Sequence, residues 1–196
     1  MPDYPDIWFL RHGETEWNLE GRIQGRRDSP LTARGRAQAL RQGAIIAPIA
    51  ARIMPGAGPI LVSPLGRARE TAALALPDLP ARFEPRLAEI DTGAWEGRLK
   101  ADLPAGLCDL EFYGAAPGGE GVEALMARVE ALLQDLGRPT IIVSHGLLGQ
   151  VLRGLVLGLD RALMGTLPNR QGCVMALSGG AEEILTAPEP VAGPTG

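Results

Sequence analysis

The stretch Ile7-Trp8-Phe9-Leu10-Arg11-His12-Gly13 decides the fold. Its first four residues form a continuous apolar run between Pro5 and Gly13, which is typical of a buried strand. Arg11 and His12 follow at the carboxyl end of that strand, where α/β proteins place their binding sites. An Arg beside a His suggests a phosphate site, because Arg binds oxyanions and a neutral His is a nucleophile. The alternative is a buried strand end whose histidine only caps a loop.

Bulk composition limits the classes of protein to which the chain can belong. Its 196 residues, 45% of them apolar, suit one domain, predicted over 1–186, with a disordered Pro- and Gly-rich tail at 187–196. A net charge of −4 and a pI near 5.3 argue against nucleic acid as a partner. No apolar run is long enough to span a membrane, and no apolar secretory segment follows the acidic N-terminus, so we expect a cytoplasmic protein. Cys108 and Cys173 match no metal-ligand spacing, and no metal is expected.

Predicted strands and helices alternate along the chain, which favours an α/β fold. We expect three layers, with a mostly parallel sheet between two layers of helices. The predicted strands are 7–10, 60–62, 82–84, 140–143 and a closing hairpin of 172–177 with 183–186; the predicted helices are 33–53, 64–76, 122–136 and 147–159. Pro48 is expected to kink or end the first helix. Residues 98–121 are predicted to form a short helix and a loop that cover one end of the sheet as a lid.

Four side chains that are cationic or can become cationic, two arginines and two histidines, lie at the ends of predicted strands. His12 and His145 are the only histidines, and each directly follows a predicted strand. Arg11 and Arg67 also lie at or just after strand ends, and Arg67 occupies the first turn of a helix, a position that attracts anions. The nearby Arg69 should point elsewhere. Because parallel strands end at one edge of a sheet, we expect these groups to meet there around an anion.

These residues lie in four motifs that closely resemble those of the histidine phosphatase superfamily, the phosphoglycerate mutase-like proteins. The motifs are Leu10-Arg11-His12-Gly13-Glu14-Thr15-Glu16-Trp17-Asn18 with Gln24-Gly25 and Leu31-Thr32; Ser63-Pro64-Leu65 with Arg67, Ala68 and Thr71; Leu87 with Glu89, Gly93 and Trp95-Glu96-Gly97; and Ser144-His145-Gly146. They follow the family order from about Ile7 to Leu185. The resemblance implies a phosphoglycerate mutase-like fold.

The resemblance also implies a role for each site residue. His12 would attack phosphorus and carry the phosphoryl group, and Glu89 would protonate the leaving alkoxide and then activate water. The residues that would bind the substrate are Arg11, Thr15, Asn18, Gln24, Gly25, Arg67, Glu89, His145 and Gly146. Positive neighbours would lower the pKa of His12 and keep it neutral. The rival acids are Glu84, Asp91 and Glu96, but only Glu89 occupies the family's acid position. No metal or cofactor is implied, since side chains supply all the cations.

The segment Trp95-Glu96-Gly97-Arg98-Leu99-Lys100 bears on the choice between phosphatase and mutase. Cofactor-dependent mutases carry a longer stretch there, with a His-Tyr-Gly sequence and basic residues for the substrate carboxylate. This chain has no His in that segment and therefore resembles phosphatases of the broad-specificity or ribazole-phosphate type. A phosphoglycerate mutase and a non-catalytic phospholigand-binding protein remain the alternatives. The substrate is expected to be a small phosphomonoester, and the sequence names neither its leaving group nor the oligomeric state.

Overall fold

Six strands form one mixed sheet in the computed structural model, which describes residues 4–53, 59–104 and 106–187. Their order across the sheet is β3-β2-β4-β1-β5-β6. The strands are β1 (Ile7–Arg11), β2 (Ile60–Val62), β3 (Ala81–Phe83), β4 (Thr140–Ser144), β5 (Val174–Ser178) and β6 (Ala181–Leu185). The first four strands run parallel, whereas β5 and β6 form an antiparallel hairpin beside β1. The sheet is therefore mostly parallel, as predicted.

The register of the two central strands fixes the position of the two histidines. Arg11 of β1 lies opposite Ser144 of β4. The backbone N–H of His12 then donates to the carbonyl of Ser144 over 2.9 Å. The residue after each strand, His12 or His145, therefore emerges at the same edge of the sheet.

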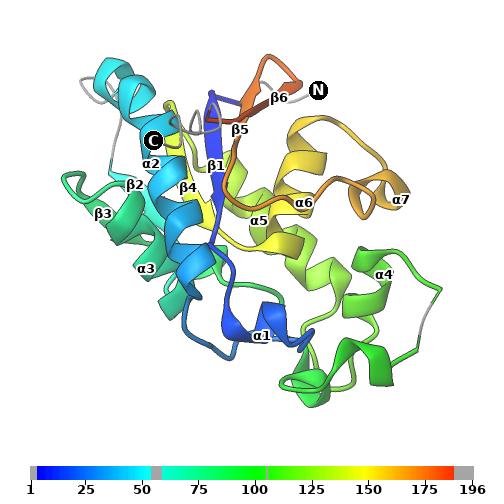
Figure 1. Ribbon diagram of the computed structural model, residues 1–196. Helices are drawn as coiled ribbons and strands as arrows, with labels where there is room; N and C mark the ends of the chain where they lie inside the picture. The colour runs from blue at the N-terminus through cyan, green and yellow to red at the C-terminus, as the bar shows by residue number, and fades with distance from the viewer. Residues whose placement is uncertain (1–3, 54–58, 105, 188–196) are drawn as a thin grey trace.

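Helices cover both faces of the sheet because its strands present apolar side chains to both sides (Figure 1). The main helices are α2 (Ala33–Ile53), α3 (Gly66–Ala75), α5 (Val122–Gln134) and α6 (Gly146–Val156). Phe9 and Ile142 pack with α5 and α6 on one face, whereas Leu10 and Val143 pack with α2 and α3 on the other. This is the three-layer arrangement that the sequence predicts.

Short elements gather beyond the carboxyl end of β1, at the lower end of the molecule in Figure 1. They are α1 (Glu16–Leu19), α4 (Asp109–Gly114) and the 3-10 turns Gly93–Trp95 and Lys100–Asp102. A further 3-10 turn, Pro85–Leu87, packs against α5, and α7 (Arg161–Met164) follows α6. A small apolar cluster of Ile23, Trp95, Leu103, Phe112 and Ala116 joins the segment predicted as a lid to the loop after α1. No helix of the described ranges combines the length and apolarity needed to cross a membrane.

Helix α2 runs through Pro48, where the sequence predicts a kink or an end. Helix-interior proline costs roughly 3 kcal/mol through its lost hydrogen bond and its ring. Ile46 and Ala50 are nevertheless buried in the core, with Ile49 and Ile53 packed against it. Burial of these apolar side chains on both sides of Pro48 offsets the free-energy cost of the proline, and the helix continues to Ile53. Of the predicted tail, all but residue 187 lies outside the described residues.

Candidate functional site

His12 lies directly after β1 with only 3% of its surface exposed. Its Nδ1 is 2.7 Å from the carbonyl oxygen of Gly13, which can only accept, so Nδ1 carries the proton and donates. Nε2 is then left with a lone pair, toward which the Nε–H of Arg67 points over 3.3 Å. Burial, and then the charges of Arg67 and Arg11, hold the pKa of His12 well below its ordinary value. The ring is a neutral base with its available lone pair on Nε2.

Arg67 is the cation most rigidly held beside that lone pair. It follows the first residue of α3, and only 2% of its surface is exposed. Nη1 donates to the carbonyl of Arg27 and to a carboxylate oxygen of Asp28, both over 2.8 Å, and Nη2 donates to the carbonyl of Gly25 over 2.9 Å. With Nε directed at His12, these contacts use four of the five guanidinium N–H groups. One N–H of Nη2 remains for a ligand.

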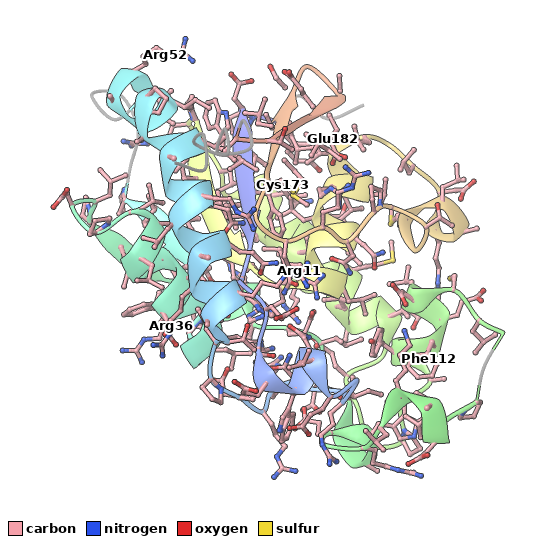
Figure 2. The ribbon with its side chains drawn as sticks, viewed as in Figure 1. Arg11, Arg36, Arg52, Phe112, Cys173 and Glu182 are labelled. Atoms are coloured by element: carbon pink, nitrogen blue, oxygen red, sulfur yellow. The ribbon has the colours of Figure 1, made fainter. Side chains whose placement is uncertain are left out.

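Arg11 closes another side of the site from the end of β1. Figure 2 shows it near the centre of the molecule, in contrast with the peripheral Arg36 and Arg52. Its Nη1 donates to the carbonyl of Asn169, and Gln42 Nε2 fixes the Arg11 carbonyl over 2.9 Å. Burial lowers the pKa of Arg11, although an arginine stays charged at neutral pH. Its buried Nε has no hydrogen-bond partner among the described residues, so it is a donor that lacks an acceptor.

His145 lies behind His12, with the two ring centres 5.2 Å apart. It is completely buried, and its Nε2 lies 2.6 Å from the hydroxyl oxygen of Ser63. Nδ1 has no partner among the described residues. Burial, followed by the positive charges of Arg67 and Arg11, lowers the pKa of His145 well below its ordinary value. In the ligand-free protein both histidines are therefore neutral.

Glu89 faces these cations from the other side of the site. Backbone N–H groups fix its carboxylate: Leu147 donates to Oε2, and Leu148 and Ile90 donate to Oε1, each over 3.0 Å. The first two donors belong to the first turn of α6, an end of a helix that favours negative charge. Glu84, Asp91 and Glu96, the other acids considered from the sequence, are not in the lining of the cavity described below.

Asn18 of α1 and Gly25, in the loop after α1, approach the site from the segment that follows β1. The Asn18 Oδ1 accepts from the backbone N–H of Thr15 over 3.2 Å and from Gln171 Nε2 over 3.3 Å. Its Nδ2 group is therefore the part left to donate. Gly25 has a φ of 53°, and a Cβ there would lie 2.3 Å from a carboxylate oxygen of Glu96, so the position requires glycine.

These groups surround a cavity of about 240 Å³, slightly below the 300–1,000 Å³ typical of drug-sized ligands. The lining includes the predicted nucleophile His12 and, of the residues expected to bind substrate, Arg11, Asn18, Gln24, Gly25, Arg67, Glu89 and Gly146. His145 lies directly behind this lining. Thr15 does not line the cavity, contrary to expectation, because its side chain caps α1 by accepting the N–H of Asn18.

Eight further residues line the cavity. They are Arg22, Ile23, Ile90, Thr92, Asp109, Tyr113, Leu147 and Asn169. Asp109 and Tyr113 come from α4, within the segment predicted as a lid, and Arg22 from the arginine-rich loop after α1. Asn169 and Thr92 carry no sequence signal, because each reaches the cavity through an irregular loop. Within the described ranges, no group of three or more His, Cys, Asp or Glu side chains is arranged to hold a metal ion.

Comparison with known proteins gives consistent matches across the chain. The sequence profile of the histidine phosphatase superfamily (branch 1) matches residues 7–185. The "Probable phosphoglycerate mutase GpmB" of Salmonella paratyphi C is 36% identical over 171 residues, which cover 78% of this chain and 75% of that protein. A solved structure described as a "putative alpha-ribazole-5'-P phosphatase", from Escherichia coli, has a TM-score of 0.74 at 29% identity, covering 94% of this chain and 97% of that one. YhfR from Bacillus stearothermophilus has a TM-score of 0.76 at 27% identity, covering 93% and 96%.

Proposed function

This chain belongs to the histidine phosphatase superfamily, and from that premise we propose that it hydrolyses a small phosphomonoester through a phosphohistidine at His12. The observation that carries the proposal is the state of the His12 ring. The hydrogen bond from Nδ1 to Gly13 leaves Nε2 as the nucleophilic atom, inside a cavity that also holds Arg67 and Glu89. A buried neutral imidazole beside two arginines is suited to attack a bound phosphoryl group.

In the first half-reaction, Nε2 of His12 attacks phosphorus and the bond to the ester oxygen breaks. Arg11, Arg67, His145 and Asn18 supply donors to the phosphoryl oxygens, where charge is spread in the transition state. A proton that Glu89 takes up when the phosphomonoester binds passes to the leaving alkoxide, so the products are an alcohol and phosphohistidine.

In the second half-reaction, water attacks the phosphorus of phosphohistidine. Glu89 takes a proton from that water, the phosphorus–nitrogen bond breaks, and inorganic phosphate leaves. His12 is again neutral and Glu89 is again protonated. The cycle consumes one ester and one water, and the only cations it uses are side chains of the protein.

Hydrolysis of an aryl phosphate in the presence of a chelator tests the proposal. We expect release of phosphate by the wild type, and no release by His12→Ala. Brief exposure to a labelled phosphomonoester should leave an acid-labile, alkali-stable label on the wild type only. Full activity of His12→Ala would refute the assignment of the nucleophile.

Phosphoglycerate mutase is the second candidate, favoured by the name of the 36% identical relative from Salmonella. It predicts interconversion of phosphoglycerates that depends on a bisphosphate primer. Release of free phosphate without an isomerised product would exclude it. A non-catalytic phospholigand-binding protein would bind phosphate but form no phosphohistidine, and the fixed position of Glu89 beside the cavity argues against this role.

A further inference from the structure

Ser63 is in hydrogen-bond contact with His145, and the proposed reaction assigns Ser63 no role. Ser63 directly follows β2, and its backbone N–H donates to the carbonyl of Val143 over 2.9 Å. Neither Ser63 nor His145 has any exposed surface, and 2.6 Å separate the serine Oγ from the histidine Nε2. No solvent competes for this hydrogen bond, so its direction decides which nitrogen of His145 carries the proton.

Counting protons shows what the serine hydroxyl can do. It has one proton to donate and two lone pairs with which to accept. The backbone N–H of Leu65 donates to it over 3.3 Å, which uses one lone pair and leaves the hydroxyl proton available. Ser63 can therefore donate to Nε2 of His145 while it accepts from Leu65. In that arrangement the neutral His145 must carry its own proton on Nδ1.

The other tautomer would suit the site poorly. It would place the proton on Nε2 and leave a buried lone pair on Nδ1, which has no hydrogen-bond partner among the described residues. Burial, and then the positive charges of Arg67 and Arg11, lower the pKa of His145, so a second proton is disfavoured. A lone pair on Nδ1 would repel the oxygens of an anion bound among these cations, whereas an N–H would donate to them.

We propose that Ser63 is a positioning residue that holds His145 in the tautomer with the proton on Nδ1, so that a neutral His145 donates a hydrogen bond to the bound phosphoryl group. The need for a phosphoryl group rests on the proposed function. His145 then serves the site without being protonated to imidazolium, and Ser63 acts only through it.

Nitrogen-15 NMR of the histidine side chains tests this proposal directly, because the chain has only two histidines. Protein labelled with ¹⁵N-histidine is measured at neutral pH, with and without inorganic phosphate, and His12→Ala assigns the two rings. We expect His145 to be neutral with the proton on Nδ1 in both states. In Ser63→Ala the orphaned Nε2 should shift the ring toward the other tautomer, and affinity for inorganic phosphate should fall about 3- to 10-fold, as expected for one hydrogen bond.

Ser144→Ala is the matched control. Ser144 is equally buried at the end of β4, but its hydroxyl donates to the carbonyl of Leu87 over 2.7 Å, so its proton is not directed at the His145 ring. This variant loses a buried hydroxyl, and we expect it to keep the His145 tautomer of the wild type.

Several outcomes would overturn the proposal. They are a proton on Nε2 of His145 in the phosphate-bound wild type, a doubly protonated ring, a chain that does not bind phosphate, and an unchanged tautomer in Ser63→Ala. The wild-type spectrum needs no variant, so a proton on Nε2 of His145 in that spectrum overturns the proposal even if Ser63→Ala fails to fold. Phosphate binding with the expected tautomer but without hydrolysis would instead refute the proposed function alone.

Discussion

Asp28 is expected to control activity although its carboxylate is not in the lining of the cavity. Its Oδ1 accepts from Nη1 of Arg67 over 2.8 Å. Its two oxygens also accept the backbone N–H groups of Gly66 and Arg67, over 2.7 and 3.3 Å, where Leu65 gives α3 no side-chain cap. The exposed carboxylate of Asp28 therefore caps the start of α3 and also fixes the guanidinium of Arg67, whose Nε–H points at His12.

The magnitude follows from these contacts. A hydrogen bond to a charged group is worth about 1.5–3 kcal/mol, and a lost cap costs about 1 kcal/mol. Because 39% of the Asp28 side chain is exposed, solvent screens the ion pair, and we take about 1–2 kcal/mol for the whole change. If the Arg67 guanidinium loses that much orientation in the transition state, kcat/KM of Asp28→Ala falls about 5- to 30-fold.

Steady-state hydrolysis of an aryl phosphate by Asp28→Ala and Asp28→Asn measures this effect. Asp28→Asn keeps an oxygen for the helix cap but loses the charge, so we expect a smaller loss of stability and a clear loss of kcat/KM. Glu70→Gln is the control, because Glu70 lies on the same helix and pairs with Arg36 at 2.9 Å instead of Arg67. The reasoning fails if both Asp28 variants keep kcat/KM within twofold of the wild type.

Two further predictions concern stability and shape. Burial lowers the pKa of His12 and of His145, so the folded protein keeps them neutral while the unfolded chain binds protons near pH 6.5. The stability that this burial provides is therefore fully present above that pH and is lost as the pH falls below it. In urea unfolding, the free energy of unfolding at pH 5.5 should be about 1–1.5 kcal/mol lower for each histidine than at pH 7.5. His12→Ala should show half of the decrease seen in the wild type. Equal decreases in both proteins would contradict the assignment to His12. Gly25→Ala should reduce kcat/KM at least tenfold. A Cβ at this position would lie 2.3 Å from Glu96 and 2.4 Å from Thr92, and would displace the Gly25 carbonyl that accepts a hydrogen bond from Arg67. Normal activity with a normal melting temperature would contradict this prediction.

The sheet and the strand-end residues were predictable because each rests on a local pattern. The continuous apolar runs of β1 and β4 require cover on both faces, and they place His12 and His145 at one edge. Arg67 was separable from Arg69 by its position in the first turn of α3, and Arg69 indeed lies over the ring of Phe83, 4.8 Å from its centre. The matches to relatives confirm the family and the fold that these motifs predict.

Features decided by packing or by loops could not be read from the sequence. Helices α1 and α7 have four residues each, too few for a periodic pattern. Thr15 lies within the first motif and is predicted to bind substrate, but in the structure its side chain accepts the backbone N–H of Asn18 and caps α1. Asn169 reaches Arg11 from 158 residues away along an irregular loop, and no local rule encodes such a contact.

The unpartnered atoms of the site indicate what its architecture is for. Arg11 Nε and His145 Nδ1 are buried without hydrogen-bond partners among the described residues, and a buried polar group left unpaired costs about 1–3 kcal/mol. Hydrogen bonds from Arg11 to the Asn169 carbonyl and between Ser63 and His145 nevertheless hold both side chains in place, and Gln42 fixes the backbone carbonyl of Arg11. A bound oxyanion carries the kind of acceptor that a buried, unpaired N–H lacks. The site is therefore organised before the ligand arrives, and the burial that leaves these donors unpaired is the same burial that keeps His12 a neutral nucleophile.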